Sequence, residues 1–265
     1  MSQRMRFAAL MVAASVAGSS AQAPRRVTID HLMSLRTIND VKISPAGNLI
    51  AYVVSTPSVA RNAHEPELYV VPVTGGPPPR VAADTQIFTP ALPAPRVRWS
   101  PDGQTISFLA LADGRPQVFT VNASGGSGRA ITRAPEGVSA YEWSPDGRYL
   151  AFLSRDAAPK TPPVANKVGG LSPATRLWLQ PLEPAGAARV LTPADQYVDS
   201  FSWSPDNQRV AYAFAPVTGF LAPYSTRIFS VAIADGAAQP IIDRPGMNVS
   251  PQYSPDGQRL SFVTT

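Results

Sequence analysis

The sequence predicts an all-β protein: a β-propeller of four-stranded antiparallel blades, of which about four and a half are present. The first observation is a short turn that recurs at spacings of 56, 44, 60 and 50 residues, each long enough for one supersecondary unit. The second is a strand with alternating apolar residues after every copy. The five copies are Ile43-Ser44-Pro45-Ala46-Gly47, Trp99-Ser100-Pro101-Asp102-Gly103, Trp143-Ser144-Pro145-Asp146-Gly147, Trp203-Ser204-Pro205-Asp206-Asn207 and Tyr253-Ser254-Pro255-Asp256-Gly257.

Each copy has the composition of a hairpin corner. Proline fixes φ at the second position of a type I turn, aspartate bonds back to the backbone, and glycine takes the left-handed position. Asn207 replaces glycine in the fourth copy and is also tolerant of positive φ. Ala46 in the first copy keeps the turn and loses the aspartate bond.

Three further strands complete the predicted blade around each turn. The strand after the turn carries an apolar residue and then, eight positions past the serine, an aromatic residue. The small residue between these two predicts that both faces of the sheet are packed. The third strands are expected at residues 68–73, 117–121, 176–182 and 227–232, and the closing strands at 80–81, 129–132, 189–192 and 240–242. One short helix is expected at residues 29–35, capped by Thr28.

Composition places the chain among globular proteins. Of its 265 residues 44% are hydrophobic and 15% charged, and there is no cysteine, so stability must come from packing and not from disulfides. The net charge is +5, but the arginines are scattered singly beside strands. This distribution argues against a nucleic-acid partner.

Residues 1–23 have the pattern of an export signal peptide. Arg4 and Arg6 precede an apolar stretch at residues 7–17, and small residues end in Ala21-Gln22-Ala23. The stretch is about half the roughly 20 residues that a spanning helix needs. We therefore expect an exported protein, periplasmic or secreted, with no membrane span and a partial propeller domain over residues 24–265.

The connections between the predicted strands are unequal in length. The long ones join second to third strands, at residues 154–175 and 213–226, or run between blades, at residues 82–96. In a four-stranded meander both kinds emerge on the same face, and binding is usually carried by variable loops on a rigid scaffold. We expect this face to meet a partner domain or a ligand; the alternative is that the loops are idle surface insertions.

No metal or cofactor site is expected. His31 and His64, the only histidines, are 33 residues apart and have no cysteine or regular acidic partner, so they are interpreted as surface residues. Turn formation accounts for the repeated aspartates without calcium. The tryptophans of the repeats recur at one blade position, which favours packing over ligand stacking; they are Trp99, Trp143 and Trp203.

The repeats, the opening segment Ile29-Asp30-His31-Leu32-Met33-Ser34-Leu35-Arg36 and residues 49–54 resemble the amino-terminal propeller of exported prolyl oligopeptidase-type (S9 family) serine peptidases, which include dipeptidyl and acylaminoacyl peptidases. The Ser-Pro-Asp-Gly turns alone are shared with other WD40-like propellers, such as TolB-type periplasmic proteins. The resemblance implies that a seven- or eight-bladed propeller caps an α/β-hydrolase domain and limits access to short or unfolded peptides. Acidic propeller residues hold the substrate amino terminus in some members, a role that Glu65 or Glu67 of the first-blade loop could take; the alternative is an exposed acidic loop.

The predicted catalytic domain is absent from this sequence. No G-x-S-x-G nucleophile elbow occurs, and the nearest approach, at residues 125–128, belongs to a hairpin turn. No catalytic residue is therefore assigned, and the chain is expected to hydrolyse nothing by itself. Because it stops after the second strand of the fifth blade, we expect a fragment of a longer protein.

Two functions are consistent with the sequence. The first is the propeller of an exported serine peptidase, which filters peptide substrates and docks on a carboxy-terminal hydrolase domain. The second is a TolB-like periplasmic propeller that binds protein partners without chemistry. The short distance between the signal and the first repeat favours the first, because a TolB-like protein carries a separate α/β domain before its blades.

Overall fold

The computed structural model describes residues 26–88, 97–157, 173–219, 222–244 and 246–264. The chain divides into two compact units, residues 1–35 and 36–265. In the first unit, α1 (Ile29–Met33) is capped by Thr28, whose hydroxyl accepts from the His31 N–H at 3.3 Å, while the His31 ring accepts from the Thr28 N–H at 3.1 Å. The predicted short helix is confirmed, and its exposed histidine is part of the cap. The predicted signal peptide lies outside the described residues.

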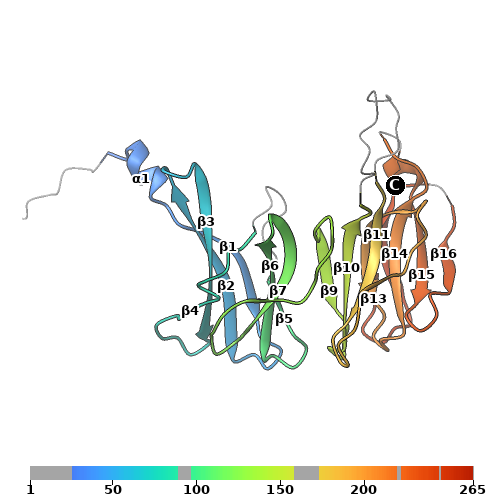
Figure 1. Ribbon diagram of the computed structural model, residues 1–265, viewed down its shortest axis with the longest axis horizontal. Coiled ribbons are helices and arrows are strands. Elements are labelled where there is room, and N and C mark those ends of the chain that lie inside the picture. The colour runs from blue at the N-terminus through green and yellow to red at the C-terminus, as the bar shows by residue number, and fades with distance from the viewer. Residues whose placement is uncertain (1–25, 89–96, 158–172, 220–221, 245, 265) are drawn as a thin grey trace, which may run out of the picture. The chain divides into compact units, whose positions relative to one another are not determined.

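The second unit is built of antiparallel sheets that follow one another in chain order (Figure 1). The first blade consists of β1 (Thr37–Ile43), β2 (Leu49–Ser58), β3 (Ala63–Pro72) and β4 (Arg80–Val81). The second consists of β5 (Arg98–Trp99), β6 (Thr105–Ala112), β7 (Arg115–Asn122) and β8 (Arg129–Ala130). The third consists of β9 (Ala140–Trp143), β10 (Tyr149–Arg155), β11 (Thr175–Pro181) and β12 (Arg189–Val190). The fourth consists of β13 (Tyr197–Trp203), β14 (Arg209–Ala215), β15 (Arg227–Ala232) and β16 (Ala238–Ile242). A last hairpin pairs β17 (Asn248–Tyr253) with β18 (Leu260–Thr264), and the 3-10 turn η1 (Ala222–Ser225) precedes β15.

Strand order within every four-stranded sheet is the order of the chain, from β1-β2-β3-β4 to β13-β14-β15-β16. This is the meander that short hairpin turns produce. The predicted class is confirmed: four complete four-stranded blades and one two-stranded sheet are present among the described residues.

The repeated turns have the predicted conformation. Gly47 has φ 72° and Asn207, in place of glycine, has φ 62°. In the fourth copy the Ser204 hydroxyl donates to Asp206 Oδ1 at 2.6 Å and accepts from the Arg209 N–H at 2.9 Å. In the first copy, which lacks the aspartate, the Ser44 hydroxyl donates instead to Asn48 Oδ1 at 2.9 Å. An asparagine four residues after the serine thus replaces the missing carboxylate.

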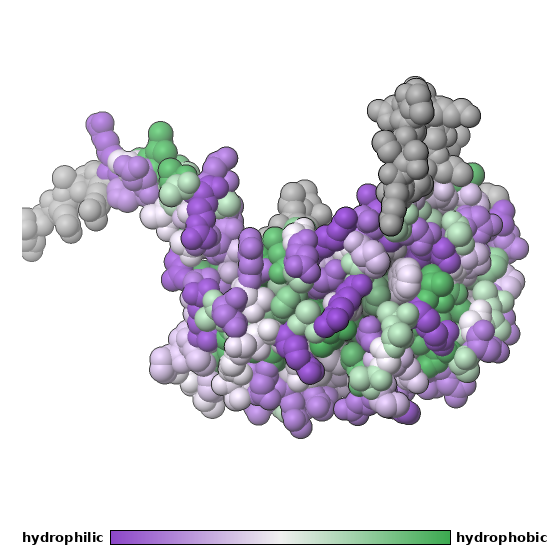
Figure 2. All heavy atoms as spheres, viewed as in Figure 1, coloured by the Kyte–Doolittle hydropathy of each residue, from purple (hydrophilic) through white to green (hydrophobic). Residues whose placement is uncertain are grey.

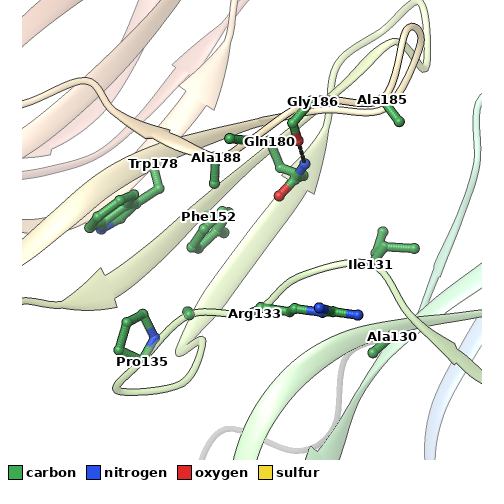
Figure 3. Close-up of a pocket in the computed structure, with 12 residues that line it drawn as sticks. Ala130, Ile131, Arg133, Pro135, Phe152, Trp178, Gln180, Ala185, Gly186 and Ala188 are labelled. Atoms are coloured by element: carbon green, nitrogen blue, oxygen red, sulfur yellow. Dashed lines mark hydrogen bonds between the residues drawn. The ribbon is translucent and has the colours of Figure 1, made fainter.

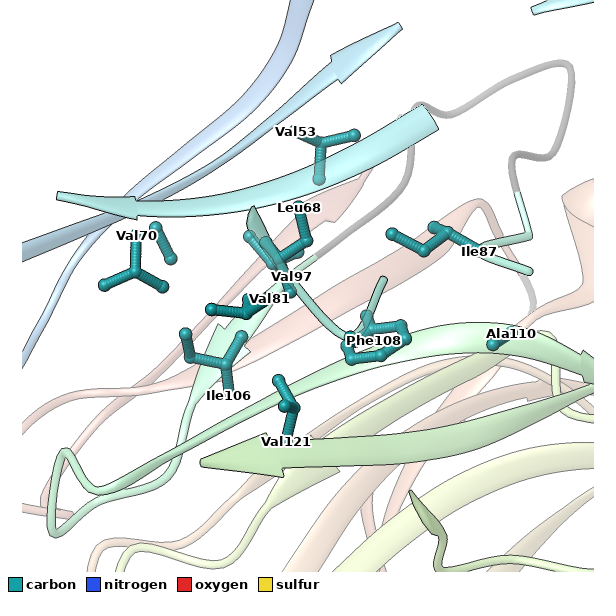
Figure 4. Packing of buried hydrophobic residues seen from close by; sticks show 12 residues of the cluster. Val53, Leu68, Val70, Val81, Ile87, Val97, Ile106, Phe108, Ala110 and Val121 are labelled. Carbon is teal, nitrogen blue, oxygen red and sulfur yellow. The ribbon is translucent and has the colours of Figure 1, made fainter. Parts of the chain in front are cut away.

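The core lies between successive blades. In the junction of the first two, Leu68 and Val53 of one blade face Phe108 and Ile106 of the next, and all four are fully buried (Figure 4). Ser107, which lies between Ile106 and Phe108 and therefore on the other face of β6, is also fully buried. Packing on both faces, as the small residues predicted, makes each blade depend on its neighbours for burial of apolar surface.

The repeated tryptophans join each blade to the one before it. The Trp99 indole donates to the carbonyl of Lys42 at 3.0 Å, and the Trp203 indole donates to the carbonyl of Glu142 at 3.3 Å. The Trp143 indole donates to the Ser107 hydroxyl at 2.8 Å. The predicted packing role is confirmed, with a directed hydrogen bond added to it.

One prediction about the first blade was wrong: Glu65 and Glu67 do not lie in a loop. Both belong to β3, which pairs with β2 as far as its first residue. Pro66 is tolerated there because β4 pairs only with Leu68 and Tyr69, so the other edge of β3 is open at the proline and no ladder donor is lost.

Hydrophilic side chains are spread over the visible face of the blades and are not gathered into one patch (Figure 2). Within the described part of the chain, no helix combines the length and the apolar character that crossing a membrane requires.

Candidate functional site

The face predicted to carry binding loops is built differently in each blade. In the first blade β2 and β3 are ten residues each, so the connection is an extended hairpin that turns through Asn62 at φ 46°. In the second blade Asp113 and Gly114 join the corresponding strands directly. The long connection predicted after β10 lies largely outside the described residues, which include only its two ends.

A cleft of about 610 Å³ opens beside the extended hairpin. One side is formed by β3 and by Arg80 of β4; the other is formed by residues 83–88, here called the cleft wall, together with Leu111 of β6. The cleft wall runs along the second blade, where the Phe88 N–H donates to the carbonyl of Leu109 at 2.8 Å. The cleft therefore lies between the first two blades.

Glu67 is the centre of the charge in this cleft. Its carboxylate lies 2.8 Å from the Arg80 guanidinium and 3.3 Å from that of Arg36, and it accepts from the Tyr69 hydroxyl at 2.9 Å. Its side chain is 22% exposed, so these partly buried bonds are stronger than those of a freely solvated pair. Glu67 is thus committed to two arginines, which leaves it little capacity to bind a substrate ammonium.

Glu65 is more accessible. Its carboxylate lies 3.4 Å from the Arg61 guanidinium at the hairpin tip, and the two side chains are 43% and 74% exposed. Exposed pairs of this kind contribute little because water and salt screen them. Of the two predicted acidic residues, Glu65 is the one that a ligand can approach by displacing a weak partner.

The cleft wall is held by the second blade. The Ala82 N–H donates to the carbonyl of Gly126 at 3.1 Å, and the Gly128 N–H donates to Asp84 Oδ1 at 3.4 Å. The hydrogen bond from the Ser127 hydroxyl is the main cause that lowers the pKa of Asp84 below its ordinary value. A charged Asp84 at neutral pH therefore fixes the wall to the turn between β7 and β8.

The lining of the cleft is rich in charged groups. Its ionisable side chains are two arginines, two glutamates, an aspartate and His64. In the ranges that the structure describes, no group of three or more His, Cys, Asp or Glu side chains could hold a metal ion. Charged groups in this pattern suit the ends or polar side chains of a peptide.

Sequence reasoning missed the arginines that share Glu67. Arg36 and Glu67 are 31 residues apart, and they meet because β1 and β3 flank β2 in the register Thr37↔Ser55 and Ser55↔Pro66. The register pair Tyr69↔Arg80 brings the second arginine to the same carboxylate. The predicted closing strand at residues 80–81, paired antiparallel with the third strand, is the sequence feature that could have placed Arg80 beside Glu67.

No protein family model matches the chain. Dipeptidyl-peptidase 5 of Porphyromonas gingivalis is 24% identical over 294 residues, which cover 96% of this chain and 42% of that protein. The chain spans less than half the length of the curated dipeptidyl-peptidase relatives it matches. These relatives confirm the resemblance to the peptidase propellers.

Solved structures show the same fold. The acylaminoacyl peptidase of Pyrococcus horikoshii superposes with a TM-score of 0.60 at 16% identity, covering 86% of this chain and 35% of that one. A TolB structure from Agrobacterium tumefaciens superposes with a TM-score of 0.55 at 19% identity, covering 87% of this chain and 70% of that one. At these identities the likeness concerns the propeller fold alone.

Proposed function

We propose that this chain, similar along nearly its whole length to dipeptidyl-peptidase 5, is the propeller part of an exported serine peptidase. The observation that carries the proposal is the sequence match that covers 96% of this chain but 42% of the relative. A catalytic α/β-hydrolase domain and further blades would then belong to the same parent protein. The apolar side chains of β1 are in keeping with a further blade, because Ile38, Val41 and Ile43 are 61%, 51% and 64% exposed.

The proposed role of the propeller is to select peptides on their way to the hydrolase serine. The cleft between the first two blades offers carboxylates and guanidinium groups to a charged peptide end. Within it, Glu65 would receive the substrate ammonium while Glu67 keeps the two neighbouring arginines in place. The chemistry itself, acyl transfer through an activated serine, would take place outside this chain and without a cofactor.

The first test is a measurement on the native protein. It is isolated from its source, labelled with a fluorophosphonate serine-hydrolase probe, and weighed intact. The proposal predicts a labelled species heavier than this chain by at least the roughly 25 to 30 kDa of one hydrolase domain, with any further blades adding to that mass. Amino-terminal sequencing of the same sample should begin at Pro24 if residues 1–23 are a cleaved signal.

The cleft has its own test in the intact enzyme. Glu65→Gln should lower kcat/KM for peptides with a free amino terminus by about threefold to tenfold, as expected for a charge-assisted contact near water. Peptides with an acetylated amino terminus should be unaffected. The matched control is Glu136→Gln, which removes the 2.6 Å ion pair with Arg115 on the second blade, outside the cleft. Equal losses with both kinds of peptide would remove Glu65 from substrate binding.

A second candidate function is a non-catalytic TolB-like propeller that binds protein partners. It is favoured by the TolB structure, of which this chain covers 70%. A native protein that ends at Thr265 and takes up no probe would support this alternative and would end the peptidase proposal.

A further inference from the structure

Each complete blade carries a cross-strand pair of aromatic residues on its second and third strands. In the fourth blade Tyr212 pairs with Phe229, and Phe214 packs edge-on against Phe229 with ring centres 5.1 Å apart. The Tyr212 hydroxyl donates to Gln196 Oε1 at 2.9 Å. In the third blade Phe152 pairs with Trp178, and their rings stack at 6.2 Å and 12°.

A cavity of about 630 Å³ lies over the aromatic pair of the third blade. We call it the junction pocket, because its other wall is residues 130–135, where β8 ends and the chain passes from the second blade to the third. Figure 3 shows Ile131, Arg133 and Pro135 on that wall, opposite Trp178 and Gln180. The volume is within the range of about 300–1,000 Å³ typical of small-ligand sites.

Small side chains keep the junction pocket open. They come from both walls and are Ala130, Ala134, Ala185, Gly186, Ala187 and Ala188. Phe152 has no hydroxyl that could donate a hydrogen bond across the pocket. Tyr212, at the same position of the next blade, makes such a bond to Gln196. The pocket therefore arises from the residues at this junction and is not a feature of every blade.

Three polar groups surround the apolar floor. Arg133 is the one charged residue of the lining; it is exposed and carries no ion pair among the described residues. The Gln180 amide nitrogen donates to the carbonyls of Pro181 at 3.0 Å and Gly186 at 2.6 Å, and its oxygen points toward the cavity (Figure 3). The Trp178 indole nitrogen is buried and has no hydrogen-bond partner within the described ranges.

We propose that the junction pocket binds the carboxy-terminal residue of a peptide when that residue has a large apolar side chain. The side chain would pack on the half-buried Trp178, whose ring stacks on the buried Phe152, and the terminal carboxylate would bind the Arg133 guanidinium, which has no ion-pair partner in the described part of the chain. The Gln180 oxygen would accept the last peptide N–H. This assignment follows from charge complementarity: an apolar floor beside one free cation and one free acceptor fits an apolar carboxylate with an adjacent N–H donor.

The experiment is a calorimetric titration of the full chain with N-acetyl-Gly-Phe and with its carboxy-terminal amide. For a ligand of this size the Kd of the acid should lie between about 0.1 and 1 mM, with the amide at least about fivefold weaker. Arg133→Ala should make acid and amide bind equally weakly. The matched control Arg129→Ala removes an exposed arginine four residues away that does not line the pocket, and it should bind like the unmodified chain.

A second variant separates the pocket from the charge. Ala188→Leu puts a larger side chain beside Trp178 and should abolish binding of both peptides while leaving the melting temperature unchanged or higher, because it fills a cavity. Absence of binding at about 10 mM acid, equal affinity for acid and amide, or insensitivity to Arg133→Ala would each overturn the proposal. The titration uses no hydrolase activity, so its outcome is independent of the proposed peptidase role.

Discussion

Replacing Ser204 by alanine should destabilise the protein more than the same change at Ser254. The two hydroxyls make matching hydrogen bonds: each donates to the aspartate of its turn, at 2.6 Å and 2.5 Å, and each accepts from the N–H of the arginine five residues later at 2.9 Å. They differ in their surroundings, since Ser204 is 6% exposed in a complete blade and Ser254 lies in the two-stranded sheet with a more exposed hydrogen-bond network. Burial is therefore the variable that the pair isolates.

The expected magnitudes follow from what replaces the lost hydroxyl. At Ser204 the Arg209 N–H is left without its side-chain acceptor where water has poor access, which costs about 1–3 kcal/mol. For a protein of this size each kcal/mol lowers Tm by about 2–4 °C, so the expected loss is about 2–12 °C. At Ser254 water can take over, so the loss should stay below about 1 kcal/mol and the Tm shift below about 4 °C.

Thermal unfolding of both variants, followed by circular dichroism and repeated in urea, measures the difference. Equilibrium unfolding curves are sufficient and no folding kinetics are needed, because only the two free energies of unfolding are compared. If Ser204→Ala and Ser254→Ala lower Tm equally, burial does not control the strength of these turns and the reasoning is refuted.

Three other changes test separate parts of the fold. The hydrogen bond from the Ser204 hydroxyl is the main cause that holds the pKa of Asp206 below its ordinary value. The stability that this carboxylate contributes is therefore present above the unfolded pKa of about 3.9 and is lost as pH falls through the lower folded pKa. Asp206→Asn should flatten the acid dependence of the unfolding free energy below about pH 4, and an unchanged slope would contradict this. Trp203→Phe removes the indole bond to the preceding blade and should cost about 1–2 kcal/mol in urea unfolding, with no measurable loss showing that the bond is dispensable. Gly128→Ala places a Cβ against the Thr85 hydroxyl, closer than van der Waals contact allows, and should speed amide hydrogen exchange of the cleft wall. Unchanged exchange would mean that the wall is not held at this turn.

Local chemistry made much of this fold predictable from the sequence. The serine turns were identified by composition, and Asn207 adopts positive φ as its substitution for glycine indicated. The closing strand expected at residues 80–81 is β4, and the helix cap at Thr28 forms as predicted. These features depend on neighbours a few residues away, which is the range over which residue type determines conformation.

The candidate sites were less predictable because they depend on register between distant strands. A period-two pattern tells which face a side chain takes, but not that Arg36 and Arg80 meet at Glu67. The segment around Pro66 was also interpreted as a loop that contains Glu65 and Glu67, whereas both residues belong to β3, whose outer edge is open at the proline. The junction pocket arises because small side chains from two distant segments leave a space between them, and no sequence motif marks such a space.

The indole bonds between blades give the propeller an order of assembly. Each of Trp99, Trp143 and Trp203 reaches back to a blade that is earlier in the chain, so its partner has already been synthesised when the tryptophan emerges. A blade can therefore dock as soon as it is complete, without waiting for later sequence. Removal of the fourth blade also removes its indole donor, Trp203, whereas removal of the first blade would leave the Trp99 indole of the second blade without its acceptor. Truncations from the two ends of such a repeat array are consequently unequal, and the amino-terminal ones leave a donor unpaired.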